Sequence, residues 1–93
     1  MARVIWQPFA LQDLIEIAAY IRQFDPPASE RYRLALRTLG DSLCDFPRRG
    51  RPATNGTREM TTVPPYVLAY RYRHADDEVD ILSIRHGRRQ PRT

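Results

Sequence analysis

Histidine and arginine are the residues of this sequence that could do chemistry. His86 is a candidate general base, because imidazole titrates near neutral pH, and Arg85 and Arg88 surround it with positive charge. A histidine at this place could equally cap a strand or contact a partner. All fifteen basic residues are arginine, whose planar guanidinium pairs with phosphate or carboxylate through two hydrogen bonds. Because a GC-rich genome also favours arginine, the positions of these residues are more informative than their number.

The arginines are concentrated in two stretches that contain no acidic residue. The first stretch contains Arg48, Arg49, Arg51 and Arg58, and the second contains Arg85, Arg88, Arg89 and Arg92. The rest of the chain has seven arginines against eleven acidic residues, although the whole chain has a net charge of +4. This segregation predicts a basic surface that suits an anionic partner, either nucleic acid or an acidic protein segment.

The segment Tyr66 to Arg73 predicts where such a surface lies. Tyr66, Leu68, Tyr70 and Tyr72 alternate with Val67, Ala69, Arg71 and Arg73, so a strand here has one largely aromatic face and one face that becomes basic. We expect the tyrosines to pack beneath helices, and a solvated Arg73 paired with nearby acidic residues is the alternative to a binding role. The predicted basic patch consists of Arg71, Arg73, Arg85, Arg88 and Arg89.

Arg58 has two interpretations at the sequence level. It could reach across an open sheet face toward a phosphate or a carboxylate of a partner. It could equally close an internal ion pair or contact a helix end. Trp6 is assigned to the core, where its indole N–H requires a hydrogen-bond acceptor.

Composition excludes several classes of protein. The chain is 42% hydrophobic and 28% charged, which is typical of a globular domain, and no apolar run approaches the roughly 20 residues that cross a bilayer. The first residues lack the pattern of an export signal, so we expect a cytoplasmic protein without a membrane partner. The lone Cys44 can form neither an internal disulfide nor a cysteine-built zinc site. We therefore expect one domain over residues 1–93, with no metal and no cofactor.

Two helices are predicted in the first half of the chain. Apolar residues at helical spacing from Leu11 to Ile21 predict a helix over residues 9–23. Asp25 followed by prolines then predicts an N-cap and the start of a second helix. Its apolar stripe continues to Phe46, where Pro47 ends it. Helices joined by so short a segment are expected to form an antiparallel hairpin.

Strands are predicted at the start of the chain and throughout its second half. Residues Arg3 to Trp6 form the first strand, and Arg58 to Val63, Tyr66 to Arg73 and Val79 to Arg85 form an antiparallel meander. Residues 48–56 are expected to be a loop, and residues 86–93 a flexible basic tail. The predicted fold is therefore a two-layer α+β domain, in which the N-terminal strand and the helical hairpin pack on an antiparallel sheet.

This order of elements, together with seven local patterns, resembles the RelE/ParE superfamily of toxins from type II toxin–antitoxin systems. The resemblance covers almost the whole chain. The matching patterns are Val4-Ile5-Trp6, Ile17-Ala18-Ala19-Tyr20-Ile21, Asp25-Pro26-Pro27-Ala28, Phe46-Pro47-Arg48-Arg49-Gly50-Arg51-Pro52, Gly56-Thr57-Arg58-Glu59, Tyr66-Val67-Leu68-Ala69-Tyr70-Arg71 and Ile81 to Arg89.

The superfamily contains both gyrase-targeting toxins and ribosome-dependent messenger-RNA nucleases, and two departures favour the former. The resemblance implies that nucleases carry an arginine where this chain has Val67, and that they place a tyrosine beyond the last strand. This chain has no tyrosine after Tyr72. An arginine at the position of Val67 would stabilise the negative charge that develops on the phosphate during cleavage. Without it, the chain would lack a stabilisation of the transition state that is worth several kcal/mol in enzymes generally. The ParE-like branch, a plasmid-stabilisation toxin without bond chemistry, is therefore the expected one.

The resemblance implies a set of partners and two alternative functions. A ParE-like toxin binds DNA gyrase and is neutralised by a ParD-like antitoxin, and no catalytic residue is then expected. The first alternative is a messenger-RNA endoribonuclease on the ribosome that uses His86 with Arg58, Arg85 or Arg89. The second alternative is an inactive relative that only binds its antitoxin. The residues expected to bind antitoxin or target are Arg58, Arg71, Arg73, Arg85, His86, Arg88 and Arg89.

Overall fold

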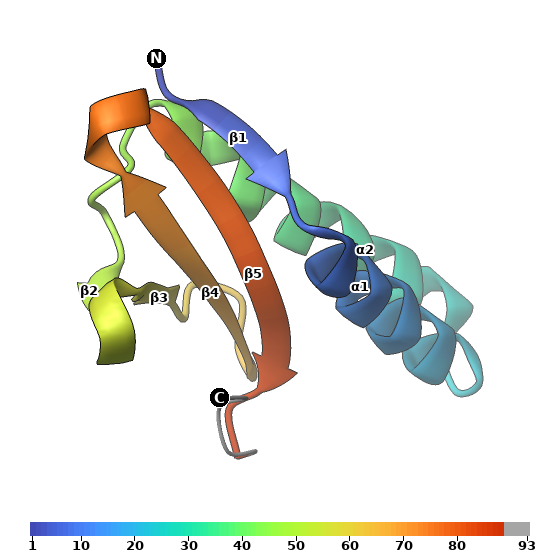
Figure 1. Ribbon diagram of the computed structural model, residues 1–93. Coiled ribbons are helices and arrows are strands. Elements are labelled where there is room, and N and C mark those ends of the chain that lie inside the picture. The colour runs from blue at the N-terminus through green and yellow to red at the C-terminus, as the bar shows by residue number, and fades with distance from the viewer. Residues whose placement is uncertain (89–93) are drawn as a thin grey trace.

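Two helices that start at prolines form an antiparallel hairpin in the computed structural model, which describes residues 1–88 (Figure 1). Helix α1 spans Pro8–Arg22 and helix α2 spans Pro26–Asp41. The carboxylate of Asp25 accepts a hydrogen bond from the backbone N–H of Ala28 at 3.1 Å, so the predicted N-cap is confirmed. The predicted start and end of the first helix each differ from the observed ones by one residue.

The second helix is shorter than its apolar stripe predicted. It ends at Asp41, and one 3-10 turn, Ser42–Cys44, follows it. The hydroxyl of Ser42 donates to the carbonyl of Leu39 at 2.6 Å, and such local bonds compete with the helical ladder. Phe46 therefore does not belong to the helix, and it is 64% exposed instead of packed in the core.

One five-stranded sheet combines both ends of the chain, in the order β1-β5-β4-β3-β2. The strands are β1 Arg3–Trp6, β2 Arg51–Pro52, β3 Arg58–Met60, β4 Tyr66–Arg73 and β5 Glu78–His86. The predicted antiparallel meander of β3, β4 and β5 is confirmed. Strand β1 pairs with β5 in parallel, so the sheet is mixed. The two-layer α+β class is thus confirmed, with both helices on one face (Figure 1).

Strand boundaries differ from the prediction on the β2–β3 side of the sheet. The short edge strand β2 lies within the region predicted to be a loop, where it pairs with β3. Strand β3 ends at Met60 and does not reach Val63. The following Pro64 and Pro65 have no backbone N–H to donate to a ladder, which explains why pairing does not continue toward them.

A β-bulge in β5 keeps two isoleucines on the same face of the sheet. Ala69 lies opposite Ser83 and Tyr70 lies opposite Ile81, which leaves Leu82 as an extra residue in β5. Because side chains alternate along a regular strand, Ile81 and Ile84 would otherwise point to opposite faces. With the bulge, both are buried beneath the helices.

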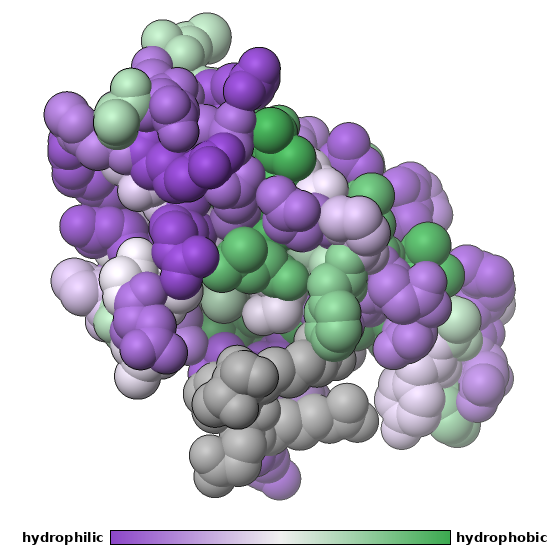
Figure 2. All heavy atoms as spheres, in the orientation of Figure 1, coloured by the Kyte–Doolittle hydropathy of each residue, from purple (hydrophilic) through white to green (hydrophobic). Residues whose placement is uncertain are grey.

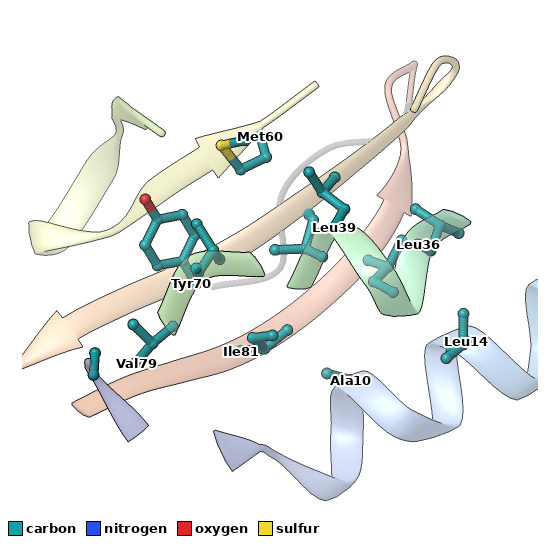
Figure 3. Close-up of a cluster of buried hydrophobic side chains, with 12 residues drawn as sticks. Ala10, Leu14, Leu36, Leu39, Met60, Tyr70, Val79 and Ile81 are labelled. Carbon is teal, nitrogen blue, oxygen red and sulfur yellow. The ribbon is translucent and has the colours of Figure 1, made fainter. Parts of the chain in front are cut away.

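The core lies between the helical hairpin and the sheet (Figure 3). Tyr70 is fully buried and Tyr66 and Tyr72 are partly buried against the core, as predicted. Trp6 also packs there, and its indole N–H donates to the carboxylate of Asp41 at 3.0 Å. The largest fully buried side chains are Tyr70, Leu36, Leu43, Leu68, Ile81 and Val79.

The buried face of α1 differs from the predicted stripe. Ile15 was expected in the core but is 60% exposed, whereas Asp13 is only 4% exposed. The carboxylate of Asp13 accepts a hydrogen bond from the backbone N–H of Ile84, which compensates for its burial. Within residues 1–88, no helix is both long and apolar enough to span a bilayer.

Candidate functional site

The face of the sheet opposite the helices carries an ion-pair cluster around Glu78. The strand register places Arg3 and Arg73 on either side of this residue. Both guanidinium groups bind its carboxylate, and Arg73 also binds Asp80, with 3.0 Å between Nε and Oδ2. The hydrogen bond from Arg3, followed by that from Arg73, lowers the pKa of Glu78 from 4.5 to about 2. Burial, reinforced by Glu78, instead raises the pKa of Asp80. The predicted pairing of Arg73 with acidic neighbours is confirmed.

A second carboxylate neutralises arginines farther along the same face. Glu59 of β3 accepts from Arg51 and from Arg85, each at 3.1 Å. The side chains of Glu59 and Arg85 are both 13% exposed, whereas that of Arg51 is 63% exposed. Arg85 is therefore held within the protein and does not extend freely into solvent.

Arg71 lies on this open face as predicted, and it donates to the backbone carbonyl of Asn55 at 3.1 Å. Val67, the residue that stands where the resemblance implied an arginine, is 5% exposed and lies opposite Arg85. Figure 2 shows apolar side chains among hydrophilic ones over the central strands of this face. The structure thus places Arg71, Arg73 and Arg85 on one face, each bound to other groups of the chain.

Arg58 lies on the helix-covered face, opposite Tyr70 in the register. Its guanidinium donates to the backbone carbonyls of Arg48 at 3.1 Å and Gly50 at 2.7 Å. Arg58 therefore does not extend over the open face, and it pairs with no carboxylate of the described residues. Side chains alternate along β3, so Glu59 points to the open face and Arg58 points away from it. Arg58 fastens the loop that follows α2 to the sheet.

Tyr70 fastens the same loop from the neighbouring strand. Its hydroxyl accepts from the backbone N–H of Gly50 and donates to the carbonyl of Pro47, both at 2.8 Å. Burial raises the pKa of this hydroxyl, so it stays protonated and keeps its donor. The loop over residues 46–49 is consequently held in one conformation while it exposes Phe46, Arg48 and Arg49.

His86 lies at the end of β5, on the opposite face from Arg85. Its ring contacts the ring of Tyr66 edge to face, with 6.0 Å between centroids, and its Nδ1 accepts from the backbone N–H of Arg88 at 3.2 Å. Arg88 is exposed. Arg89, the remaining residue of the predicted patch, and most of the predicted tail lie outside the described residues.

The structure reveals a surface on α2 that the sequence did not predict. We call it the α2 groove: it has a volume of about 580 Å³ and lies between the segment Arg31 to Ser42 and the residues Arg49, Thr62 and Val63. Leu34 is 56% exposed at this groove. A second hollow, of about 600 Å³ over residues 45–49, shares Arg49 with it. The signal in the sequence that could have indicated this surface is the occurrence of small residues at helical spacing along α2.

Residues 1–88 contain no group of three or more histidine, cysteine, aspartate and glutamate side chains placed to hold a metal ion.

The family model of the ParE toxin of type II toxin–antitoxin systems matches residues 4–91. This chain belongs to the ParE toxin family. A relative from Caulobacter vibrioides, described as toxin RelE2, is 51% identical over 89 residues, which cover 96% of this chain and 99% of the relative. This relative carries the RelE name although the family model is that of ParE.

Solved structures of the superfamily share the fold. A chain of the chromosomal ParDE toxin–antitoxin system from P. aeruginosa matches 92% of this ParE-family chain and 96% of its own length, with a TM-score of 0.82 and 22% identity. A chain of the RelBE2 toxin–antitoxin complex from Mycobacterium tuberculosis matches 91% and 96%, with a TM-score of 0.69 and 26% identity. The two helices on a mixed sheet are therefore the scaffold of RelE/ParE toxins.

Proposed function

We propose that this chain is a ParE-like toxin that binds DNA gyrase, arrests it on cleaved DNA, and performs no bond chemistry itself. The observation that carries the proposal is the separation of the residues that a nuclease would need. Arg85 and His86 are successive residues of a strand, so their side chains lie on opposite faces of the sheet. A general base and a phosphate-binding arginine must instead converge on one reacting group.

The other arginine of the nuclease hypothesis is also remote from His86. Arg58 lies opposite Tyr70 and His86 lies opposite Tyr66. Four residues of β4 separate these positions, which corresponds to about 13 Å along the strand. Arg58 is in addition bound to two loop carbonyls. These contacts support a structural role for Arg58 and a binding role, without catalysis, for the toxin.

A cognate antitoxin is the second partner in this proposal. The similar structures come from a ParDE system and from a RelBE2 complex, and the family is that of type II toxin–antitoxin systems. A ParD-like antitoxin that covers basic and apolar surface of the toxin would neutralise it. The prediction from the sequence that Arg71, Arg73, Arg85, His86, Arg88 and Arg89 bind antitoxin or target stays a proposal, whereas the contacts of Arg58 favour a role in holding the loop.

One observation favours a second candidate function. The relative with 51% identity is named toxin RelE2, and RelE-like toxins are the ribosome-dependent nucleases of the superfamily. A messenger-RNA endoribonuclease that uses His86 with Arg85 or Arg89 is therefore the alternative. It requires these groups to converge when the ribosome or the transcript binds.

Induction of this chain alone in bacteria distinguishes the two functions. We expect growth arrest with induction of the DNA-damage response and with intact transcripts, detected by a damage-responsive reporter and by mapping of transcript ends. Cleaved transcripts without DNA breaks would replace the gyrase proposal by the nuclease. The absence of growth arrest would favour an inactive relative that only binds the antitoxin.

A further inference from the structure

A tight turn between α2 and β2 presents an aromatic ring together with two guanidinium groups. We call residues Phe46 to Arg49 the arginine turn. The backbone N–H of Arg49 donates to the carbonyl of Phe46 at 3.1 Å, which closes the turn. Pro47 occupies its second position, where the fixed φ of proline favours a β-turn. Phe46 is 64% exposed, and Arg48 and Arg49 are exposed as well. The local sequence therefore holds these three side chains close together in solvent.

The positive charge of the arginine turn is not neutralised by the chain itself. Within residues 1–88, Arg48 and Arg49 belong to no ion pair. Arg48 lies over the ring of Tyr72, 5.2 Å from its centroid, and Arg49 donates to the hydroxyl of Ser42 at 3.3 Å. Asp45 is the one acidic residue among those that line the hollow at this turn. The turn thus differs from the open sheet face, where carboxylates bind the arginines.

A third guanidinium group lies behind the turn and adds to its positive potential. Arg58 donates to the backbone carbonyls of Arg48 and Gly50. Burial raises the pKa of Tyr70, whereas the charges of Arg58 and Arg49 act to lower it. These arginines therefore favour negative charge at the turn, and an anionic ligand that approaches it is attracted.

The arginine turn is fixed before any ligand binds. The hydroxyl of Tyr70 donates to the carbonyl of Pro47 and accepts from the N–H of Gly50, so the backbone is held on both sides of the arginines. The ring of Tyr72 further restricts Arg48. A ligand consequently loses less free energy in ordering this surface than it would on a flexible loop.

The side chains of the turn match the two chemical parts of a nucleotide. Guanidinium groups pair with phosphate oxygens, often through two parallel hydrogen bonds. An exposed aromatic ring stacks on the flat face of a base that is not paired within a helix. An acidic peptide would supply negative charge to Arg48 and Arg49, but it would leave Phe46 without a planar partner. The combination therefore favours a nucleic acid over an acidic protein segment.

We propose that the arginine turn binds the cleaved DNA on which the toxin arrests gyrase. Arg48 and Arg49 contact phosphates, and Phe46 stacks on an unpaired base beside the break. This inference rests on the proposed function and adds that the toxin touches the DNA directly as well as the enzyme.

The test measures how tightly the purified full-length chain binds labelled nucleic acids, by fluorescence anisotropy at several salt concentrations. The first ligand is a DNA duplex with a single-stranded overhang, and the second is a blunt DNA duplex of the same paired sequence. The third is an RNA duplex with the same overhang. A polyglutamate peptide represents an acidic protein segment.

Two kinds of variant separate the phosphate contacts from the stacking contact. Arg48→Gln and Arg49→Gln each remove a charge of the turn, and Arg22→Gln is their control at an exposed arginine of α1. Phe46→Ala removes the ring, and Phe24→Ala is its control, because Phe24 is a similarly exposed phenylalanine, at 72%. Thermal unfolding verifies that all five variants fold.

We expect each arginine variant of the turn to weaken binding to both DNA duplexes about threefold or more. Each should also lower the slope of log affinity against log salt by about one, since one phosphate contact is lost. Phe46→Ala should weaken binding to the duplex with the overhang about fivefold or more and leave the blunt duplex unchanged. Both controls should stay within about twofold of the unaltered chain.

Failure of the unaltered chain to bind either DNA duplex, or equal affinities in all variants, would overturn this inference. Tighter binding to the RNA duplex would also overturn it and support the nuclease instead. Polyglutamate that binds as tightly as the DNA with the overhang would indicate a site for an acidic protein. Induction of the unaltered chain in bacteria tests the proposed function separately: growth arrest with DNA damage, without DNA binding by the purified chain, removes the inference alone.

Discussion

The buried carboxylate of Asp13 on α1 accepts a hydrogen bond from the backbone N–H of Ile84 on β5, at 2.9 Å. The bond joins the helical layer to the sheet two residues beyond the bulge at Leu82. An apolar residue at position 13 would continue the stripe of the helix, but it would leave this N–H without an acceptor. Asp13 therefore has a structural role, because its carboxylate satisfies a backbone N–H of the sheet.

Replacement of Asp13 tests this connection. We expect Asp13→Ala to lower the free energy of unfolding by about 1–3 kcal/mol, because a buried N–H loses its partner. Asp13→Asn keeps an oxygen acceptor and should retain most of the stability. Chemical denaturation of the three proteins measures the difference, and equal losses in both variants would contradict the assigned role.

The hydroxyl of Tyr70 gives a second prediction. Tyr70→Phe removes one acceptor and one donor from the loop and should cost about 1–3 kcal/mol of stability. It should also speed hydrogen exchange at Gly50. Tyr72→Phe is the control, since within residues 1–88 its hydroxyl bonds to the exposed Asp77 and to no loop backbone. If both variants lose the same stability, the loop is not fastened by Tyr70.

Gly40 is explained by its contact with Trp6. A Cβ atom at position 40 would lie 2.4 Å from Cζ2 of Trp6 and 2.7 Å from Cδ1 of Ile81. Alanine favours a helix over glycine by about 1 kcal/mol, but we expect overpacking to make Gly40→Ala destabilising by about 1–3 kcal/mol. In a Trp6→Leu background the same substitution should cost less, and a double-mutant cycle from thermal unfolding measures this coupling.

The low pKa of Glu78 predicts a specific response to acid. Folding favours the ionised form of Glu78. The contribution of Glu78 to stability is therefore fully present above pH 4.5 and is lost as the pH falls toward about 2. Glu78→Gln should therefore flatten the dependence of the melting temperature on pH in this interval. Asp76→Asn, at an exposed partner of Arg73, should leave that dependence in place. An unchanged profile for Glu78→Gln would mean that other groups control acid unfolding.

His86 gives the prediction that bears on function. If the toxin performs no bond chemistry, His86→Gln should still arrest growth and induce DNA damage, because no proton transfer is required. Growth curves and a damage-responsive reporter measure the outcome. Loss of arrest in a variant that keeps its melting temperature and still binds gyrase would favour catalysis.

The sequence by itself determined both helices and four of the five strands, β2 being the exception, and therefore the α+β class. Asp25 before two prolines marks the second helix, and the alternation from Tyr66 to Arg73 marks the central strand, because both signals are local. The same alternation predicted that Arg71 and Arg73 share a face. The end of α2 was not predicted, because it depends on a side-chain hydrogen bond from Ser42.

Only the tertiary structure decided which charges are free and which surface is open. Arg85 and Glu59 are 26 residues apart, and Arg3 and Glu78 are 75 residues apart, so no local pattern reveals that these pairs neutralise each other. The bulge at Leu82 shifts the alternation of β5, and the packing of α2 leaves Leu34 exposed instead of buried. Ion pairing and packing arise from the relative placement of distant segments, whereas helix and strand signals arise within a few neighbouring residues.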